Sequence, residues 1–199
     1  MVSVLMPVYN GLPMIKASVT SLLNQTYTDW ECIFVDDGST DGTSEFLDTL
    51  TDSRFKVVHL HNNSGRAIAR QTALDSAHGE FIAMLDADDL YHPDKLKRQV
   101  DFLINHPEIS LVSSAICSFG TASDLKYKRQ IQTYGCQIIE YKKVLPSHAC
   151  SMLRMEYARK CFYKPYLKLA EDVDFLDQYL KGRSYAVISD ILYLSLIHI

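Results

Sequence analysis

Three carboxylates, Asp86, Asp88 and Asp89, follow directly on the apolar run EFIAML. A hydrophobic strand that ends in acidic side chains presents oxygen ligands at the edge of a sheet. Mg²⁺ and Mn²⁺ prefer such ligands, are held by one or two carboxylates, and complete their coordination with water and substrate phosphates. The pattern therefore predicts a divalent-cation site for a phosphate-bearing substrate. The alternative is an exposed acidic turn before the next helix, and an isolated Asp-x-Asp would favour that alternative.

A second acidic group has the same setting. The apolar run ECIFV leads at once into Asp36 and Asp37, which open the segment DDGSTDG. The first apolar run, SVLMPVYN, ends in Tyr9 and Asn10. A tyrosine ring at such a place can stack on a nucleobase, although simple packing is its more frequent role. Because ligands of open α/β sheets bind outside the carboxyl ends of the strands, we expect these strand ends to share one crevice.

A third acidic group, Glu171, Asp172 and Asp174, lies at the start of a segment with apolar residues at helical spacing. Carboxylates in a first helical turn interact favourably with the helix dipole, which is a sufficient structural reason for them. A helix N-terminus can also hold a carboxylate toward a cleft, and a transfer reaction needs a general base. Spacing alone favours the structural role.

Strand and helix patterns alternate over the first 120 residues, which is typical of βαβ units and a parallel sheet. We expect strands at residues 3–9, 31–35, 55–61, 80–85 and 109–120, and helices at residues 11–27, 39–50, 66–79 and 93–106. Helix 39–50 should be capped, and helix 66–79 should end on Gly79. From residue 121 to 168 short polar, tyrosine-rich segments favour loops and a hairpin.

The expected fold class is therefore α/β, with a Rossmann-like, mostly parallel sheet flanked by helices. With 199 residues, the chain is expected to form a single domain over residues 1–199. Residues 1–120 would contain the sheet and its acidic strand ends. Residues 121–199 would form a smaller second half that covers the crevice.

Composition narrows the function classes. The net charge of −4 and the pI near 5.9 argue against a nucleic-acid or anionic-membrane surface, because those partners select basic patches. Five irregularly spaced cysteines lack the close pairs of structural zinc sites and suit a reducing cytosol. The sequence shows neither a signal peptide nor a run of about 18 apolar residues. We expect a cytoplasmic protein without a transmembrane segment, which could associate with a membrane peripherally.

Five segments together resemble the family 2 glycosyltransferases of GT-A fold: VSVLMPVYNG, DDGSTDGT, GRAIARQTAL, LDADD and the pair Glu171–Asp172. Each is moderately specific alone, but five in this order make coincidence improbable. The resemblance implies an inverting, metal-dependent enzyme that moves a sugar from a nucleotide-diphosphate sugar to a hydroxyl of a glycan or lipid-linked acceptor. UDP is the leading nucleotide, and polysaccharide or lipopolysaccharide synthesis is the implied setting. Residues 1–120 would bind the donor, and residues 121–199 would lie on the acceptor side.

The resemblance also implies which residues bind the donor. The nucleotide sugar would contact Pro7, Val8, Tyr9, Asn10, Asp36, Asp37, Gly65, Arg70, Asp86 and Ala87. Within this set, Asp37 would accept a hydrogen bond from the base, and Tyr9 would lie against the base ring. Arg70 would brace the pocket and pair with the acidic strand end, and Asp86 would face the ribose.

The reacting groups are implied in the same way. Asp88 would hold Mn²⁺ or Mg²⁺, which stabilises the negative charge of the departing nucleotide diphosphate. Asp172 would be the catalytic base that removes the proton of the acceptor hydroxyl, and Glu171 would support it. His148, in LPSHACSML, could face the acceptor pocket, although a packed histidine is the more frequent case.

Two further hypotheses remain open. One is a degenerate, non-catalytic sugar-nucleotide binder, against which the intact Asp37, Asp88 and Asp172 argue. The other is a receiver-type signalling domain, which also gathers aspartates and Mg²⁺ at strand ends, but is shorter and needs no Glu-Asp helix.

The last residues, LYLSLIHI, depart from the family pattern, which continues with a basic or histidine-bearing segment over the diphosphate. We expect either a C-terminal truncation or a non-native reading frame over residues 195–199, with replacement by His198 as the third reading.

Overall fold

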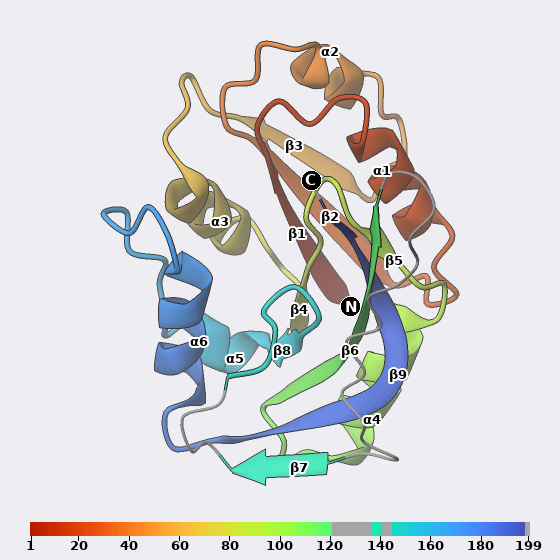
Figure 1. Ribbon diagram of the computed structural model, residues 1–199, viewed down its shortest axis with the longest axis vertical. Helices are drawn as coiled ribbons and strands as arrows, with labels where there is room; N and C mark the ends of the chain where they lie inside the picture. Colours follow the sequence, from red (N-terminus) through yellow and green to blue (C-terminus); the bar gives the residue numbers. More distant parts are fainter. Residues whose placement is uncertain (121–136, 141–144, 198–199) are drawn as a thin grey trace.

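The computed structural model describes residues 1–120, 137–140 and 145–197. Its strands are β1 (Val2–Val8), β2 (Trp30–Asp36), β3 (Phe55–His59), β4 (Phe81–Met84), β5 (Leu90–Tyr91), β6 (Leu111–Gly120), β7 (Gln137–Glu140), β8 (Met152–Arg154) and β9 (Ser184–Ile197). Its helices are α1 (Ile15–Leu23), α2 (Thr43–Asp48), α3 (Arg66–Asp75), α4 (Lys95–Asn105), α5 (Met155–Ala158) and α6 (Glu171–Leu180). These described strands form one sheet in the order β3-β2-β1-β4-β8-β6-β9-β5, and β7 pairs with β9 (Figure 1).

The first four strands of that order are parallel neighbours. At their carboxyl ends Val8 of β1 pairs with Asp36 of β2, and Asp36 pairs with His59 of β3. On the other side of β1, Leu5 pairs with Met84, the last residue of β4. The segments that follow these strands therefore emerge at one edge of the sheet. The crevice that they are expected to share stays a prediction.

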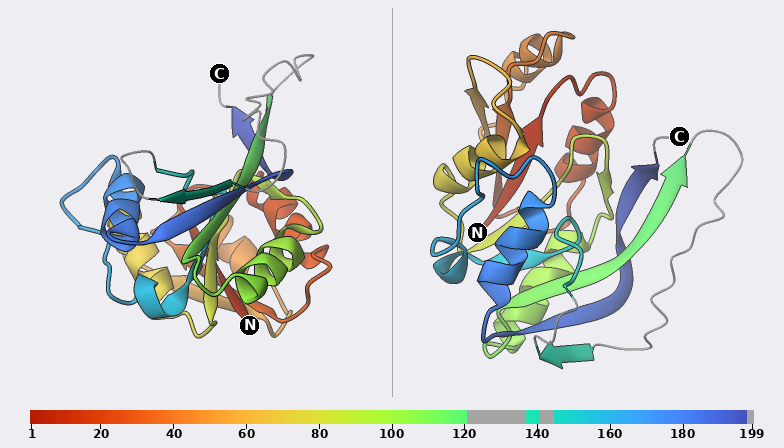
Figure 2. Two further views of the ribbon diagram at one scale, coloured as in Figure 1. Left: turned by 90° about the horizontal axis from the view of Figure 1, so that it is seen from below. Right: turned by 60° about the vertical axis from the view of Figure 1, so that its left-hand side comes forward.

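The remaining strands make the sheet mixed. Strand β8 lies antiparallel between β4 and β6, and β6 runs parallel to β9. Strand β5 closes the order as an antiparallel neighbour of β9. Figure 2 shows β6 and β9 curving side by side away from the helices.

Each face of the sheet packs against its own helices because neighbouring strand residues point to opposite sides. Val4 and Met6 of β1 belong to the core that also contains the apolar sides of α1 and α4. Leu5, between them, belongs to the core built with α3 and α6. Figure 1 accordingly shows these two pairs of helices on opposite sides of the sheet. The helices on both faces thus hold the loops that follow the carboxyl ends of the parallel strands.

Two helix boundaries differ from the sequence-based expectation. Helix α2 begins at Thr43, because Gly42 directly before it has a left-handed backbone with a φ of 93°. Helix α3 ends at Asp75, and Gly79 is not its cap. A Cβ atom at Gly79 would lie 2.6 Å from the backbone nitrogen of Ser3, so this glycine permits close contact with β1.

The predicted loops and hairpin of residues 121–168 fall partly outside the described residues. The described part of this region forms β7, β8 and α5. In the portion of the chain that is described, the helices are too short and too polar to cross a bilayer.

Candidate functional site

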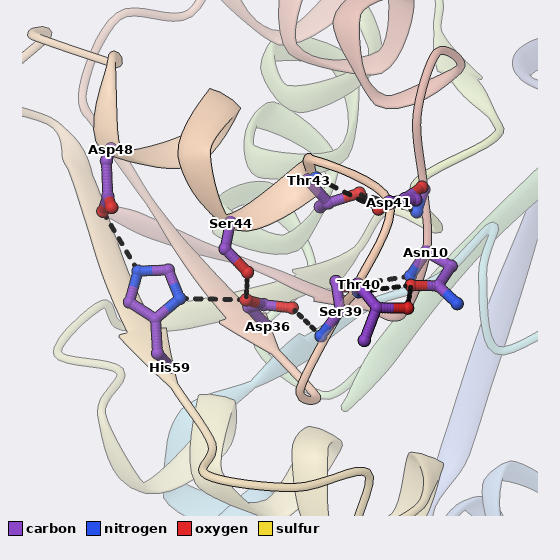
Figure 3. A network of polar contacts seen from close by, with 10 residues as sticks. Asn10, Asp36, Ser39, Thr40, Asp41, Thr43, Ser44, Asp48 and His59 are labelled. Atoms are coloured by element: carbon purple, nitrogen blue, oxygen red, sulfur yellow. Dashed lines mark hydrogen bonds and ion pairs between the residues drawn. The ribbon is translucent and has the colours of Figure 1, made fainter.

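Asp36, at the carboxyl end of β2, is turned toward α2 (Figure 3). Its side chain accepts hydrogen bonds from the Ser39 N–H at 3.0 Å, from the Ser44 hydroxyl, and from His59 Nδ1 at 2.9 Å. Burial disfavours the carboxylate, but these three bonds outweigh it and lower the pKa of Asp36. This carboxylate therefore organises the loop after β2, and its side-chain bonds go to protein groups.

The same loop is tied to the end of β1 through Asn10. The Asn10 side-chain oxygen accepts a bond from the Thr40 N–H at 2.8 Å, and the Asn10 N–H donates to the Ser39 hydroxyl at 2.9 Å. Asn10 has a positive φ of 51°, a conformation that asparagine tolerates better than most residues. Beside it Tyr9 is 49 % exposed, so its ring is accessible to a ligand.

Asp37 joins the second strand end to the loop that precedes α3. Its two carboxylate oxygens accept bonds from the N–H groups of Ser64 at 2.7 Å and Gly65 at 2.9 Å. Gly65 has a φ of +95°, which glycine adopts without strain. Each oxygen keeps a second lone pair, so the carboxylate can still accept a bond from a ligand N–H.

Arg70, on α3, connects the end of β4 with the start of α6. Its guanidinium lies 2.7 Å from a Glu171 oxygen and 3.3 Å from an Asp86 oxygen. Arg70 and Glu171 are buried, whereas the Asp86 side chain is 37 % exposed. Burial raises the pKa of Asp86, Arg70 opposes this effect, and Asp88 adds to it as a nearby like charge. The predicted pairing of Arg70 with the acidic strand end is present.

A pocket of about 250 Å³ opens at this ion network. It is lined by Arg70, Asp86, Leu145, Pro146, Ser147, His148, Ala149, Asp172, Val173 and Leu176. Asp172 lies in the first turn of α6, partly exposed, and one of its oxygens accepts a bond from the Val173 N–H at 2.9 Å. The predicted base and the predicted donor-binding strand end thus meet in one cavity.

Glu171 takes a different position from its neighbour. It is 2 % exposed, is absent from the pocket lining and contacts Arg70. Its carboxylate is enclosed by protein and bonds to Arg70, so any support that Glu171 gives to the site acts through the position of that arginine.

Of the wall formed by residues 145–149, only His148 was named from the sequence, as a residue that could face the acceptor pocket. His148 is buried in this wall, and Leu145 and Pro146 flank it. The signal was a lone histidine, and packing was its more frequent explanation. No residue spacing linked this segment to α6.

Asp86 and Asp89 have separate surroundings. Asp89 is 5 % exposed and accepts a bond from the Leu196 N–H of β9 at 2.7 Å. Burial raises the pKa of Asp89 to about 6. The initial group of three carboxylates is therefore divided, since Asp89 fastens the turn to β9 while Asp86 lines the pocket.

Asp86 and Asp88 offer the carboxylate ligands that a divalent ion completed by its substrate would use. Among the described residues, no three His, Cys, Asp or Glu side chains are grouped to hold a metal by themselves. Mg²⁺ and Mn²⁺ sites commonly use one or two carboxylates together with substrate phosphates and water. The donor set on this strand end has that composition.

The other predicted contacts lie along the same edge. Pro7 is half-buried and Val8 is buried at the end of β1. The Ala87 carbonyl accepts a bond from the Ser18 hydroxyl of α1 at 2.8 Å. His198, considered above as a replacement for the family's C-terminal segment, lies outside the described residues.

The chain is similar to known glycosyltransferases. The family model described as "Glycosyl transferase family 2" matches residues 3–162. Over 106 residues the chain is 45 % identical to the putative teichuronic acid biosynthesis glycosyltransferase TuaG of Bacillus subtilis, covering 52 % of this chain and 42 % of TuaG. Over 143 residues it is 36 % identical to WfgD of Escherichia coli, named UDP-Glc:alpha-D-GlcNAc-diphosphoundecaprenol beta-1,3-glucosyltransferase, covering 68 % of this chain and 56 % of WfgD. The chain thus spans about half the length of these relatives.

Solved structures agree with this result. The crystal structure of S. aureus TarS 1–349 in complex with UDP superposes with a TM-score of 0.83 at 25 % identity, and covers 98 % of this chain and 60 % of that one. The predicted GT-A fold is therefore confirmed. The match leaves no support for the receiver-type hypothesis.

Proposed function

Because this chain belongs to glycosyl transferase family 2, we propose that it transfers a sugar from a UDP-sugar to a hydroxyl of a glycan or lipid-linked acceptor, with inversion. Two of the similar proteins support the nucleotide and the acceptor class: TarS binds UDP, and WfgD is named for UDP-glucose and a diphosphoundecaprenol acceptor. The setting would be the synthesis of a polysaccharide or lipopolysaccharide.

One observation carries this proposal. The end of β4 and the first turn of α6, whose Asp86 and Asp172 are 86 positions apart in the sequence, face the same pocket across Arg70. A donor bound at the sheet edge would bring its sugar into this pocket. The acceptor hydroxyl would then meet Asp172.

The reaction needs one base and one departing group. The acceptor oxygen attacks the anomeric carbon, and Asp172 takes the hydroxyl proton as the new bond forms. The bond from that carbon to the diphosphate oxygen breaks, and its electron pair leaves with UDP. A single displacement of this kind inverts the anomeric configuration without a covalent intermediate.

The remaining residues bind and orient. Asp37 and Tyr9 would hold the base at the ends of β2 and β1, and Arg70 would brace the pocket beneath the ribose side, where Asp86 lies. Glu171 would fix Arg70 through their 2.7 Å ion pair and act as a positioning residue. A bound Mn²⁺ or Mg²⁺, held by Asp88 and the diphosphate, would supply a Lewis acid for the charge on the departing UDP.

A donor panel tests this function. The chain would be incubated with UDP-glucose, UDP-N-acetylglucosamine, UDP-galactose, GDP-mannose and TDP-glucose, with Mn²⁺, with Mg²⁺ or with EDTA. Slow hydrolysis of at least one UDP-sugar, lost in EDTA, is expected. UDP binding without turnover of any donor would favour the non-catalytic binder, and indifference to all nucleotides would refute the proposal.

A further inference from the structure

A tight turn after β4 carries the two carboxylates that offer ligands to a divalent ion. The backbone N–H of Asp89 donates to the Asp86 carbonyl at 3.1 Å, which closes a β-turn over residues 86–89. Leu85 and Asp89 are buried, whereas Asp86 and Asp88 are half-buried. The positions of both candidate ligands therefore depend on how the ends of this turn are held.

Strand β9 holds the turn through a tyrosine that lies outside the predicted site. Tyr193 is fully buried, and its hydroxyl accepts a hydrogen bond from the Asp86 N–H at 3.3 Å. Further along β9, the Leu196 N–H donates to an Asp89 oxygen at 2.7 Å. Residues of β9 thus bond to both ends of the turn.

The Tyr193 hydroxyl also joins the two ends to each other. Burial raises the pKa of Tyr193 well above its ordinary value, so the phenol keeps its proton. Burial raises the pKa of Asp89 as well, and a hydrogen bond from the Tyr193 hydroxyl opposes that effect. Since a backbone N–H can only donate, the hydroxyl accepts from Asp86 and donates to Asp89, as one phenol can do at the same time.

A second tyrosine fixes the ring of Tyr193. Tyr91 of β5 is its cross-strand neighbour in the antiparallel pairing of β5 with β9, and the two rings pack edge-to-face at 5.8 Å between their centroids. The Tyr91 hydroxyl donates to the carbonyl of Met84, the last residue of β4. One hydroxyl of the pair therefore holds the end of β4, and the other holds the turn that follows it.

We propose that Tyr193 is a positioning residue for the cation ligands, because its hydroxyl fixes the turn that carries the Asp86 and Asp88 carboxylates. The inference rests on the proposed function and on the divalent ion that it includes. Tyr193 is enclosed by protein, so it acts through the turn and contacts neither the nucleotide nor the sugar. Removing a hydrogen bond that orients metal ligands commonly weakens metal binding by roughly 10-fold to 100-fold.

Tyr193→Phe tests this role because it removes the hydroxyl and keeps the ring. UDP affinity would be measured by calorimetry over a series of Mn²⁺ concentrations and in EDTA. The Mn²⁺ concentration that gives half of the full UDP binding should rise about tenfold. At saturating Mn²⁺ the UDP affinity should return to that of wild type, because excess cation fills the weakened site and the other nucleotide contacts are unchanged.

Tyr179→Phe is the matched control. The Tyr179 ring is also fully buried, and its hydroxyl also accepts from a backbone N–H, that of Arg154 at 3.0 Å, and donates to an oxygen, that of the Ser110 carbonyl at 2.6 Å. These bonds hold β8 and the residue before β6, and none of them reaches the turn. The control should therefore keep the wild-type Mn²⁺ requirement, and urea unfolding shows whether both variants are folded.

Asp89→Asn gives an independent test if Tyr193→Phe does not fold. It weakens the same bridge from its other end, so the Mn²⁺ requirement should rise in the same way. A Mn²⁺ requirement equal to that of Tyr179→Phe, or a loss of UDP affinity that persists at saturating Mn²⁺, would overturn the positioning role. Wild type that binds UDP equally well with Mn²⁺ and in EDTA would overturn it too, although nucleotide binding would stand. Wild type that binds no UDP under any condition would instead refute the proposed function.

Discussion

At the scale of single residues, adjacent aspartates perform different tasks. Asp36 and Asp37 are neighbours in the sequence, yet the first bonds to the α2 side of its loop and the second to the loop before α3. The alternation of side chains at a strand end explains the difference, because consecutive residues point to opposite faces. The two adjacent carboxylates therefore hold different loops, Asp36 the loop before α2 and Asp37 the loop before α3.

Asp36→Asn should destabilise the fold without removing the donor site. The change weakens charge-assisted bonds to Ser39, Ser44 and His59 in a buried position, which costs about 1–3 kcal/mol of unfolding free energy. Urea unfolding measures this cost, with Asp48→Asn as the control, since the Asp48 side chain is 69 % exposed and contacts the same histidine. The control should change stability by less than about 0.5 kcal/mol. A stable Asp36→Asn protein with lost UDP binding would contradict this division of roles.

At the scale of elements, the loop after β2 contains Gly38, which lies close to the backbone of the loop before α3. Gly38 and Gly182 share a φ of +74°. A Cβ at Gly38 would lie 2.7 Å from the Asn62 backbone carbon, whereas a Cβ at Gly182 would meet nothing within 4 Å. The two positions therefore separate backbone strain from steric overlap.

Both alanine variants should lose about 1 kcal/mol of stability from the left-handed backbone alone. Gly38→Ala should lose clearly more, because the loops before α2 and α3 must move apart, and UDP affinity should fall with it. Chemical unfolding and calorimetry compare the two proteins. Equal losses of stability in the two variants would show that the loop moves to accommodate the Cβ atom and that its close contact with Asn62 does not contribute to stability.

Helix α4 begins with a lysine that is buried without an acidic partner in the described residues. Lys95 is 0 % exposed, donates to Gln99 at 2.8 Å and lies 4.3 Å from the centre of the Tyr91 ring. Burial lowers the pKa of Lys95 to about 7. The unfolded chain keeps the ordinary, higher lysine pKa. The destabilisation by Lys95 is therefore complete below pH 7, and it decreases as the pH rises from 7 toward the pKa of the unfolded chain.

Lys95→Met should therefore raise the free energy of unfolding by about 1–4 kcal/mol at pH 6. The gain should shrink at pH 9, where wild type no longer buries a charge. Urea unfolding at both pH values measures it. Lys97→Met, at an exposed position paired with Asp101, should give no pH-dependent difference. A gain that is equal at pH 6 and pH 9 would show that packing, and not charge burial, causes the effect.

The sequence predicts those parts of the fold that depend on local order. The apolar runs before Asp36 and Asp86 are strands, and their alternation follows the two cores. Contacts between residues that are distant in the sequence were harder to predict. Arg70 meets Glu171 across 101 positions, and the wall around His148 approaches α6 only in the folded chain. Helix α2 is shorter than its pattern because Gly42 has a left-handed backbone and the Thr40 N–H before it bonds to the distant Asn10 side chain.

At the scale of the whole molecule, the pocket lies where three units meet. The end of β4 provides Asp86, α3 provides Arg70, and α6 provides Asp172. The Arg70 ion pairs join these units. Under the proposed function, the position of the base Asp172 therefore depends on the same contacts that shape the donor side.

The most direct measurement compares donor hydrolysis and UDP affinity in wild type and Asp172→Asn, with the UDP-sugar that the panel identifies. We predict that donor hydrolysis by Asp172→Asn is about 100-fold or more slower than by wild type, because a general base acts in the transition state. UDP affinity should stay within about threefold, because the base does not hold the nucleotide. Hydrolysis that persists at the wild-type rate, or UDP affinity lost together with hydrolysis, would contradict the assignment of this pocket as a glycosyl-transfer site with Asp172 as its base.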